Sequence, residues 1–571
     1  MRLHKIFYAL LIFAVISMID ISVFLKFNWL FGAPDLQFHL QRIDELYQNV
    51  LSLHFFPLLA TYHFNQVGSA VMSMYPKLPL YVYVFVRVLL RNPILSYYVG
   101  NAVMVWIGLL IGYFSFLSVM PKEKVMAFIF SITYGLSSVL VSYQYRIADL
   151  GVVSALLVLP LAFSGFYHWI SSGRYRMMAI GITLVLLCHV LTFIFLILTL
   201  IIFTIINIKK ISKKKILSLS KAVVATVLLT STYWLPAMVI SFTTRINPPQ
   251  VFSLGGMDLS QFVKDALTNN VTFGFSIIAF LGFVLGTVGY KQLYKPFKQI
   301  YWVSISYVIL SSSLIPWKIF QHTPLWIIQF PWRFIGISQL GFSVLFSIGL
   351  ITFLSSLSKK FSVILCVMAV TIITVGLAVN LQARYVSFEL PSPEFKHPVT
   401  PTHSFVVRRS EVWDKITNKR EYQNLMKFNG TYDYYPQKTM HLSAWISEDK
   451  ARINGKKRDV ITTTKSLPDG KIFILRTKRM RKYLTLPFIL YNKNYSVSVD
   501  GRGVAPVLNR QQLLTINDVS AGRHVIKVSY NETIIFIAMI LLTMSGVVWL
   551  VHPGNLMSKR LKFGMKQGVN E

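Results

Sequence analysis

Residues 34–42 read PDLQFHLQR and follow the first long apolar run of the chain. If a helix begins at Asp35, His39 lies four residues and Arg42 seven residues further along, so all three share one face. Apolar residues form a stripe about a third of a turn away: Leu36, Leu40, Ile43 and Tyr47. The stretch therefore predicts a helix on a membrane surface that turns a carboxylate, an imidazole and a guanidinium away from lipid. The alternative is that Asp35 only favours the helix N-terminus and that His39 and Arg42 merely face water.

Carboxylates are scarce in the first part of the chain. Those before Asp258 are Asp20, Asp35, Asp44, Glu45, Glu123 and Asp149. A charged group near lipid costs several kcal/mol unless it is solvated or paired. Each of these acids is therefore a candidate for a specific role.

The composition indicates a polytopic membrane protein. The chain has 571 residues, of which 54% are hydrophobic and 14% charged, and its mean hydropathy is +0.54, so most of it belongs in a bilayer. Part of the net charge of +35 lies in clusters between apolar segments, as the positive-inside bias predicts. The rest lies in a polar region near the C-terminus, and a basic extramembrane domain attracts polyanions or anionic headgroups.

Neither cofactor nor metal is specified by a motif. Cys188 and Cys366 both lie in apolar runs, so no disulfide or cysteine-based metal site is expected. No residue pattern has the spacing of a metal site, which leaves the cofactor unknown and dependence on a divalent metal open.

Apolar runs and their Lys/Arg flanks predict about twelve transmembrane helices with both termini in the cytoplasm. The N-terminal run has no A-x-A-like cleavage site, so we interpret it as a retained first span. The run 177–208 is interpreted as two short spans that meet near Cys188 and His189. The predicted spans are 6–25, 94–120, 125–143, 150–169, the two within 177–208, 216–240, 271–290, 300–314, 334–354, 361–381 and 534–551.

Three regions follow from this topology. Residues 1–381 form the transmembrane domain, with an outer loop at 28–94 that holds interfacial helices, one of them at 81–90. Residues 382–531 lie outside the cell, begin with a mixed part that holds a helix around 411–427, and continue as a small antiparallel β-sandwich from residue 440. That sandwich is predicted by alternating stretches such as KIFILRT (471–477) and HVIKVSY (524–530), separated by Asp-Gly and Ala-Gly turns. Residues 532–571 supply the last span and a basic tail, SKRLKFGMK, at 558–566.

Polar groups from distant segments converge on the outer face in this topology. They are Asp35, His39, Arg42, Lys77, Arg146, Asp149, His189, Arg333 and the stretch 432–436, which includes Tyr434. A carboxylate can take a proton from a hydroxyl nucleophile. Arginines stabilise the charge on a departing phosphate through bidentate hydrogen bonds.

Each member of this set also has a structural interpretation. Asp149 and Arg146 fit a salt-bridged loop, and His189 fits a core histidine with satisfied nitrogens. Arg333 follows Trp332, as a headgroup anchor would. Lys77 and Tyr434 also fit purely structural roles.

The order of short motifs along the chain carries a family resemblance. PDLQFHLQR is followed by MYPKLP (74–79), YRIADLG (145–151) with LVLPLAF (157–163), LCHVLTF (187–193), YWLP (233–236), FPWRF (330–334) and YDYYP (432–436), and then by the β-rich region. In this order the chain resembles bacterial YfhO-like membrane proteins, which are related to the 6-pyruvoyl-tetrahydropterin synthase-related membrane proteins. Both groups resemble the GT-C superfamily of multi-span glycosyltransferases.

The resemblance implies a polyprenyl-phosphate-linked sugar as donor and Asp35 as catalytic base. It assigns the second acidic motif to Asp149, the phosphate-facing role to Arg333 or Arg146, and a place near the donor or acceptor to His189. Where relatives read acidic-Tyr-Leu-Pro, this chain has Asp-Tyr-Tyr-Pro at 433–436.

We therefore expect an integral-membrane glycosyltransferase of the bacterial plasma membrane. It transfers the sugar, with inversion, to a hydroxyl of an anionic envelope polymer or glycolipid on the outer face, such as a teichoic-acid-like polymer. Nucleic acid is not expected as a partner of a domain outside the cell. Two alternatives remain from the sequence: a transporter or flippase for a lipid-linked sugar, and a non-catalytic envelope scaffold in which the β-domain does the binding. For the basic β-domain itself, the alternative to binding the anionic acceptor is a solvated face that only keeps the domain near anionic lipid.

Overall fold

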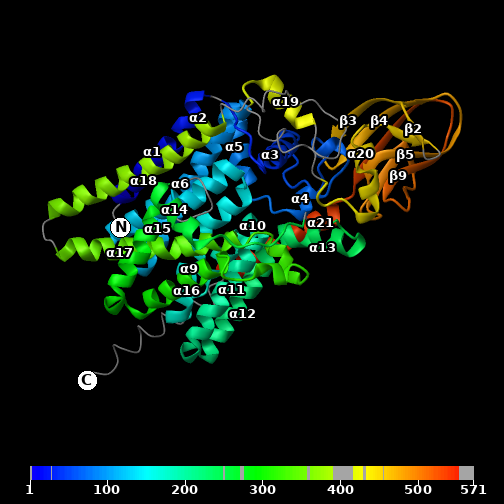
Figure 1. Cartoon of the computed structure of the whole chain (residues 1–571). Helices are drawn as coiled ribbons and strands as arrows, with labels where there is room; N and C mark the ends of the chain where they lie inside the picture. Colours follow the sequence, from blue (N-terminus) through cyan, green and yellow to red (C-terminus); the bar gives the residue numbers. More distant parts are fainter. Residues whose placement is uncertain are drawn as a thin grey trace.

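The computed structural model describes residues 3–27, 29–247, 251–269, 276–356, 360–389, 416–427, 432–453 and 456–551. The basic tail at 558–566 and the start of the predicted span at 271–290 lie outside the described residues. In Figure 1 the long helices form one part of the molecule and the β-strands the other, and α3, α4, α13 and α21 lie between them.

The helical part follows the apolar runs of the sequence. In chain order its helices are α1 (Leu3–Asp20), α2 (Ser22–Phe27), α3 (Leu36–Leu51), α4 (Val71–Met74), α5 (Leu80–Leu90), α6 (Pro93–Val119), α7 (Lys124–Gly135), α8 (Ser138–Val141), α9 (Leu150–Ser172), α10 (Arg176–Cys188), α11 (Val190–Ile206), α12 (Lys213–Leu229), α13 (Ser231–Thr243), α14 (Leu259–Thr268), α15 (Ile277–Val288), α16 (Lys295–Ser311), α17 (Ile335–Ser356) and α18 (Lys360–Glu389). The short helices α19 (Lys419–Lys427) and α20 (Ser443–Ile446) precede the strands, and α21 (Thr533–Val551) follows them.

The predicted number of about twelve spans is not confirmed. Among the described residues, six helical segments are long and apolar enough to cross a membrane: Pro93–Val119, Lys124–Ile147, Leu150–Ser172, Pro331–Leu354, Ile364–Ala383 and Thr533–Val551. The pair α12 and α13 would be a seventh, but it bends by 68°. The remaining apolar helices are shorter, because several apolar runs are broken within their length.

Two of these breaks matter for the site. The run 177–208 divides at His189, between the end of α10 and the start of α11, so the predicted break is confirmed, whereas both helices are among the shorter apolar ones and the two predicted spans are not confirmed. The run 216–240, expected as one span, is instead broken at Thr230. The Thr230 hydroxyl donates to the carbonyl of Thr226, 2.7 Å away, and such local bonds compete with the helical ladder.

The β-rich region is an antiparallel sandwich, as predicted. Its strands are β1 (Ala451–Ile453), β2 (Lys456–Arg458), β3 (Ile461–Leu467), β4 (Gly470–Thr477), β5 (Arg481–Ile489), β6 (Tyr495–Val499), β7 (Arg502–Val504), β8 (Val507–Leu508), β9 (Leu513–Val519) and β10 (Gly522–Tyr530). One sheet has the order β2-β1-β5-β9-β8 and the other β3-β4-β10-β6-β7. Phe473, opposite Ile526 in the second sheet, shares a core with Leu484 and Phe488 of the first.

This core is not confined to the strands. It also contains Leu58 and Val67 from the loop after α3, and Ile535 from α21. Gly68 has a φ of +73°, and a Cβ at this position would lie 2.7 Å from the Phe488 ring, so only glycine fits the turn. The loop that was assigned to the transmembrane domain therefore also forms part of the sandwich core.

Helix α3 does not lie on a surface. His39 and Arg42 are each 1% exposed, so the predicted water-facing face is wrong. The side-chain amide of Gln37 donates to the carbonyl of Leu425 in α19, 3.0 Å away. Long polar side chains can be buried in this way because backbone carbonyls satisfy them.

Candidate active site

The two acidic motifs meet through the backbone. The N–H of Asp35 donates to the carbonyl of Ile147, 2.9 Å away, which joins the start of α3 to the turn that precedes α9. Asp35 is the N-cap residue of α3, yet its side chain makes no capping hydrogen bond, and it is half-buried. Its carboxylate is therefore not used by the helix that it begins.

Asp149, in contrast, is held on several sides. Its Oδ1 accepts from the N–H of Val152 at 3.1 Å and from the Tyr75 hydroxyl at 3.4 Å. His39 Nε2 lies 3.6 Å from the same oxygen. Asp149 is 5% exposed. It caps α9 and fixes its neighbours, so it is a weaker candidate than Asp35 for proton transfer.

His39 is oriented by Arg42. Arg42 Nη1 lies 3.4 Å from His39 Nδ1, and because a guanidinium can only donate, Nδ1 accepts. In a neutral imidazole the proton then sits on Nε2, toward Asp149. Burial is the largest influence on the pKa of His39 and lowers it, so the ring is neutral near pH 7.

Arg42 itself organises the loop MYPK. It donates to the carbonyls of Pro76 at 2.6 Å and Tyr75 at 3.3 Å, and its guanidinium carbon lies 4.1 Å from the centre of the Tyr75 ring. These contacts hold Tyr75 against Asp149. Arg42 therefore positions the MYPK loop and Tyr75 and has a structural role in the site.

The two acids differ in protonation. Burial first, and then the negative charges of Asp149 and Asp433, raise the pKa of Asp35 to about 7, although Arg333 opposes them. Burial would also raise the pKa of Asp149, but its hydrogen bond with His39 and the electrostatic influence of His189 hold it well below the usual range. A group with a pKa near 7 beside a permanent carboxylate is the arrangement expected of a general base and its partner.

Arg333 and His189, which act electrostatically on Asp35 and Asp149, line one cavity together. The cavity is small, about 10 Å³, and Tyr143, Thr192 and Ile337 also line it. Arg333 lies in the short helix Pro331–Phe334. Its Nη1 donates to the Ile328 carbonyl at 3.2 Å and to Gln329 Oε1 at 3.0 Å, whereas its buried Nε has no hydrogen-bond partner among the described residues. This buried N–H is a donor that an anionic ligand would satisfy.

One ring nitrogen of His189, Nε2, can donate a hydrogen bond to a ligand. Its Nδ1 accepts from the N–H of Thr192 at 3.2 Å, which caps α11. A backbone N–H can only donate, so a neutral His189 carries its proton on Nε2. The break between α10 and α11 thereby provides a hydrogen-bond donor.

No protein-family model matches the chain, and no curated protein matches it. Among solved structures, the arabinofuranosyltransferase AftD from mycobacteria matches 67% of this chain and 27% of its own, with a TM-score of 0.42 and 11% identity. ArnT from Cupriavidus metallidurans, bound to undecaprenyl phosphate, matches 61% of this chain and 60% of its own, with a TM-score of 0.34 and 11% identity. The chain spans less than two thirds of either protein. Both TM-scores are low, so the function of this chain is argued from its own residues.

The other predicted residues are placed in three different ways. Tyr434 and Asp433 approach the site, because the charge of Arg42 acts on Tyr434 and that of Asp433 acts on Asp35. Arg146 lies half-buried in the π-helical turn Ser142–Ile147. Lys77 is directed elsewhere: its ammonium donates to the carbonyls of Pro57 and Met72 at 2.7 and 3.4 Å.

Sequence reasoning did not single out two participants, although one of them, Asp433, lies in the predicted stretch 432–436. Asp433 raises the pKa of Asp35, and Tyr75 bonds to Asp149. Both residues lie within motifs of the family resemblance, YDYYP and MYPKLP. The presence of an acidic or phenolic side chain inside such a motif is the signal that could have identified them. Neither motif showed which side chain turns inward.

A glycine allows this close approach. A Cβ on Gly151 in α9 would collide with the Tyr75 hydroxyl and would lie 3.2 Å from the Cys188 carbonyl. We expect Gly151→Ala to lower stability by about 1–3 kcal/mol, since inserting a methyl group into a packed site displaces its neighbours. Thermal unfolding of the purified protein in detergent measures this change.

Gly255→Ala is the matched control, because a Cβ at Gly255 meets no atom within 4 Å. It should unfold at the wild-type temperature. If both variants unfold alike, the packing of Tyr75 against α9 does not limit stability.

Among the described residues, one group of three side chains has the composition of a metal site: His54, Asp469 and Glu532. It lies beyond the far end of α3 from Asp35. The 16 residues of α3, a helix about 24 Å long, lie between Asp35 and His54. We treat it separately below.

Proposed function

We propose that this protein is an integral-membrane glycosyltransferase that moves a sugar from a polyprenyl-phosphate-linked donor to a hydroxyl of a cell-envelope polymer or glycolipid. The observation that carries the proposal is Asp35. It is a half-buried carboxylate with a pKa near 7 and no capping bond, influenced by the charge of Arg333. A glycosyl transfer needs a base of this kind next to a cationic site for the departing phosphate.

In this reaction Asp35 takes the proton from the acceptor hydroxyl as its oxygen attacks the anomeric carbon. Arg333 and the Nε2 proton of His189 bind the phosphate that leaves with the electron pair of the broken bond. Direct attack from the opposite side inverts the anomeric configuration. Asp149, His39 and Arg42 hold the surrounding loops, and burial together with the charge of Asp149 keeps the pKa of Asp35 near neutrality.

The lipid tail of the donor has a suitable apolar site. A cavity of about 520 Å³ is lined mainly by apolar side chains of α6, α9, α16 and α17, and Ile337 lines both this cavity and the small one that holds Arg333. Asn207 and Lys210 line it as well. A polyprenyl chain seated there would leave its phosphate beside Arg333.

The sandwich is proposed to bind the acceptor outside the cell, with both termini in the cytoplasm. Its edge strand β2 exposes Lys456, Lys457 and Arg458, and Arg502 is exposed on β7. Lysines and arginines on one domain raise the local concentration of a polyanion. An anionic polymer such as teichoic acid is an acceptor that these exposed cations would attract.

The test uses purified protein in detergent with undecaprenyl-phosphate-linked sugars and a glycerol-phosphate polymer. Release of free undecaprenyl phosphate together with labelled polymer is the expected result. A transporter or flippase has no membrane to cross under these conditions and would release neither product. Absence of turnover with all donors, by protein that still unfolds cooperatively, would contradict the proposal.

The activity should depend on pH through Asp35. A base with a pKa of about 7 is about one-tenth ionised one pH unit below that value and about nine-tenths ionised one unit above. The value of kcat/KM should therefore rise with pH, by roughly tenfold between pH 6 and pH 8. Initial rates of polymer labelling across this range measure it.

Asp433→Asn provides the comparison. The charge of Asp433 helps to raise the pKa of Asp35, so its loss should move the rising limb to lower pH while the plateau remains. A wild-type profile that is flat from pH 5.5 to 8.5 would remove Asp35 as the titrating base.

A further inference from the structure

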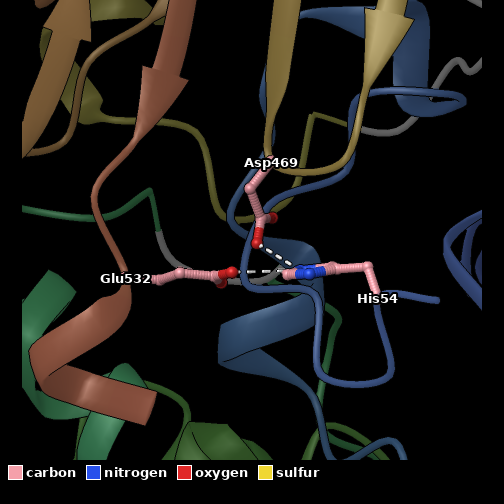
Figure 2. A group of neighbouring side chains, drawn as sticks. All are labelled: His54, Asp469 and Glu532. Carbon is pink, nitrogen blue, oxygen red and sulfur yellow. Dashed lines mark hydrogen bonds and ion pairs between the residues drawn. The ribbon is translucent and has the colours of Figure 1, made fainter. Parts of the chain in front are cut away.

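Three segments far apart in sequence meet at one point between the helices and the sandwich (Figure 2). His54 comes from the loop after α3, Asp469 from the turn between β3 and β4, and Glu532 from the residue before α21. The side chains of His54 and Glu532 are 21% and 24% exposed, and that of Asp469 is 2% exposed. Polar groups this far from bulk water need defined partners.

One imidazole nitrogen faces both carboxylates. His54 Nε2 lies 2.9 Å from Asp469 Oδ2 and 3.4 Å from Glu532 Oε1. The three ligand atoms all lie within 4.8 Å of one another. A single N–H has one proton and one direction, so it satisfies one of these oxygens well but not both.

A bound cation accounts for all three positions. Two carboxylates this close repel each other unless a proton or a cation lies between them. A Zn²⁺ ion has bond lengths of about 2.0–2.2 Å to nitrogen and carboxylate oxygen, which separates ligands in a tetrahedron by about 3.4 Å. The measured separations are compatible with this size after small rotations of the side chains.

The carboxylate of Asp469 is already positioned for such a role. Its Oδ1 accepts from the N–H groups of Leu58 and Leu59 at 2.9 and 2.6 Å, and Oδ2 also lies 3.1 Å from the N–H of Leu58. Outer bonds of this kind orient metal ligands. Asp469 has a φ of +46°, and its carbonyl accepts from Tyr530 at 2.9 Å, so the turn is anchored as well.

Lys77 does not replace the cation. Its charge acts on both Asp469 and Glu532, but its ammonium donates to the carbonyls of Pro57 and Met72. It bonds to neither carboxylate, which leaves the point between the three ligand atoms to another group.

We propose that His54, Asp469 and Glu532 bind one divalent transition-metal ion, with Zn²⁺ the best match to one nitrogen and two carboxylate oxygens. The ion fastens the loop after α3, the β3–β4 turn and the start of α21 to one another. A fourth position stays available for water. This role is structural and does not depend on the proposed glycosyl transfer.

The test measures metal binding by the full-length protein in detergent. The protein is stripped with a chelator, incubated with Zn²⁺, Mn²⁺ or Ca²⁺ alone, freed of unbound ion and analysed by elemental mass spectrometry. We expect about one Zn²⁺ per chain and a rise in the temperature of unfolding, which the chelator reverses. His54→Asn and Glu532→Gln should each weaken Zn²⁺ binding by about a hundredfold or more, since each removes a direct ligand.

The matched control is another histidine–aspartate pair of the sandwich. His524 Nδ1 lies 2.8 Å from Asp500 Oδ2, and no third acidic or histidine ligand joins this pair among the described residues. His524→Asn should therefore bind Zn²⁺ like the wild type. Unfolding of all variants in chelator, compared with the stripped wild type, shows that they are folded.

Two results would overturn the proposal. Stripped wild-type protein that binds none of the three ions, and whose unfolding none of them shifts, would leave a proton between the carboxylates instead. Equal Zn²⁺ binding by wild type, His54→Asn and Glu532→Gln would place any bound ion elsewhere.

Discussion

Asp35→Asn is expected to lower kcat/KM for sugar transfer by about a hundredfold to ten-thousandfold, the range that a general base contributes. Asparagine has nearly the same shape but cannot accept the proton of the acceptor hydroxyl. Because the Asp35 side chain makes no capping bond, the change should leave α3 intact. Sugar incorporation in membranes with matched expression of wild type and variant measures the effect.

Asp258→Asn is the control for this prediction. Asp258 is also the N-cap residue of its helix, but it is exposed and its Oδ1 accepts from the Ser260 N–H at 2.7 Å. Asparagine can make the same bond, so transfer should stay near the wild-type rate. Full activity of Asp35→Asn would remove the proposed base.

Arg333→Lys is expected to lower kcat by about a hundredfold to a thousandfold, comparable with the loss of one donor from an anion-stabilising site. Lysine keeps the positive charge but loses the planar fork that gives two hydrogen bonds to phosphate. The donors that Arg333 directs to Ile328 and Gln329 would also be lost in part. Single-turnover release of undecaprenyl phosphate isolates this step from binding.

Arg174→Lys serves as the comparison. Arg174 is exposed and follows the opposite end of α9, where it contacts Ser172 and His168. Its replacement should change turnover less than twofold or so, as surface substitutions usually do. A similar rate for Arg333→Lys and wild type would mean that Arg333 anchors the loop and does not stabilise the leaving phosphate.

Structural features that depend on residues close together in the sequence were predicted correctly. The β-strands follow from alternation and turns, and the break at His189 follows from basic flanks at both ends of one long apolar run. The surface position of α3 was predicted wrongly, because an amphipathic stripe looks the same on a membrane helix and on a helix buried in protein. His39 and Arg42 are buried because carbonyls of the loop 75–76 accept from the Arg42 Nη2 group and the carboxylate of Asp149 lies beside His39.

The sequence could predict only that the site residues lie on the same side of the membrane, because that follows from the predicted topology. Asp35, Asp149 and Arg333 do interact electrostatically. Lys77 lies in the same predicted outer loop as Asp35, but its ammonium donates to backbone carbonyls instead. The group of His54, Asp469 and Glu532 had no sequence signal. His54 and Asp469 are separated by 415 positions, and metal-site patterns in sequence rely on short spacings.

The sequence by itself determined that the chain is rich in apolar helices, that a β-sandwich precedes α21, and that few acids are available for chemistry. These properties follow from composition and short-range periodicity. Only the tertiary structure showed which of the two acids does not cap its own helix. Asp149 is held by the start of its helix and by Tyr75, whereas the half-buried side chain of Asp35 makes no capping bond with the helix that it begins. Protonation and availability depend on burial and on charges from other segments, and the order of residues along a chain does not contain those distances.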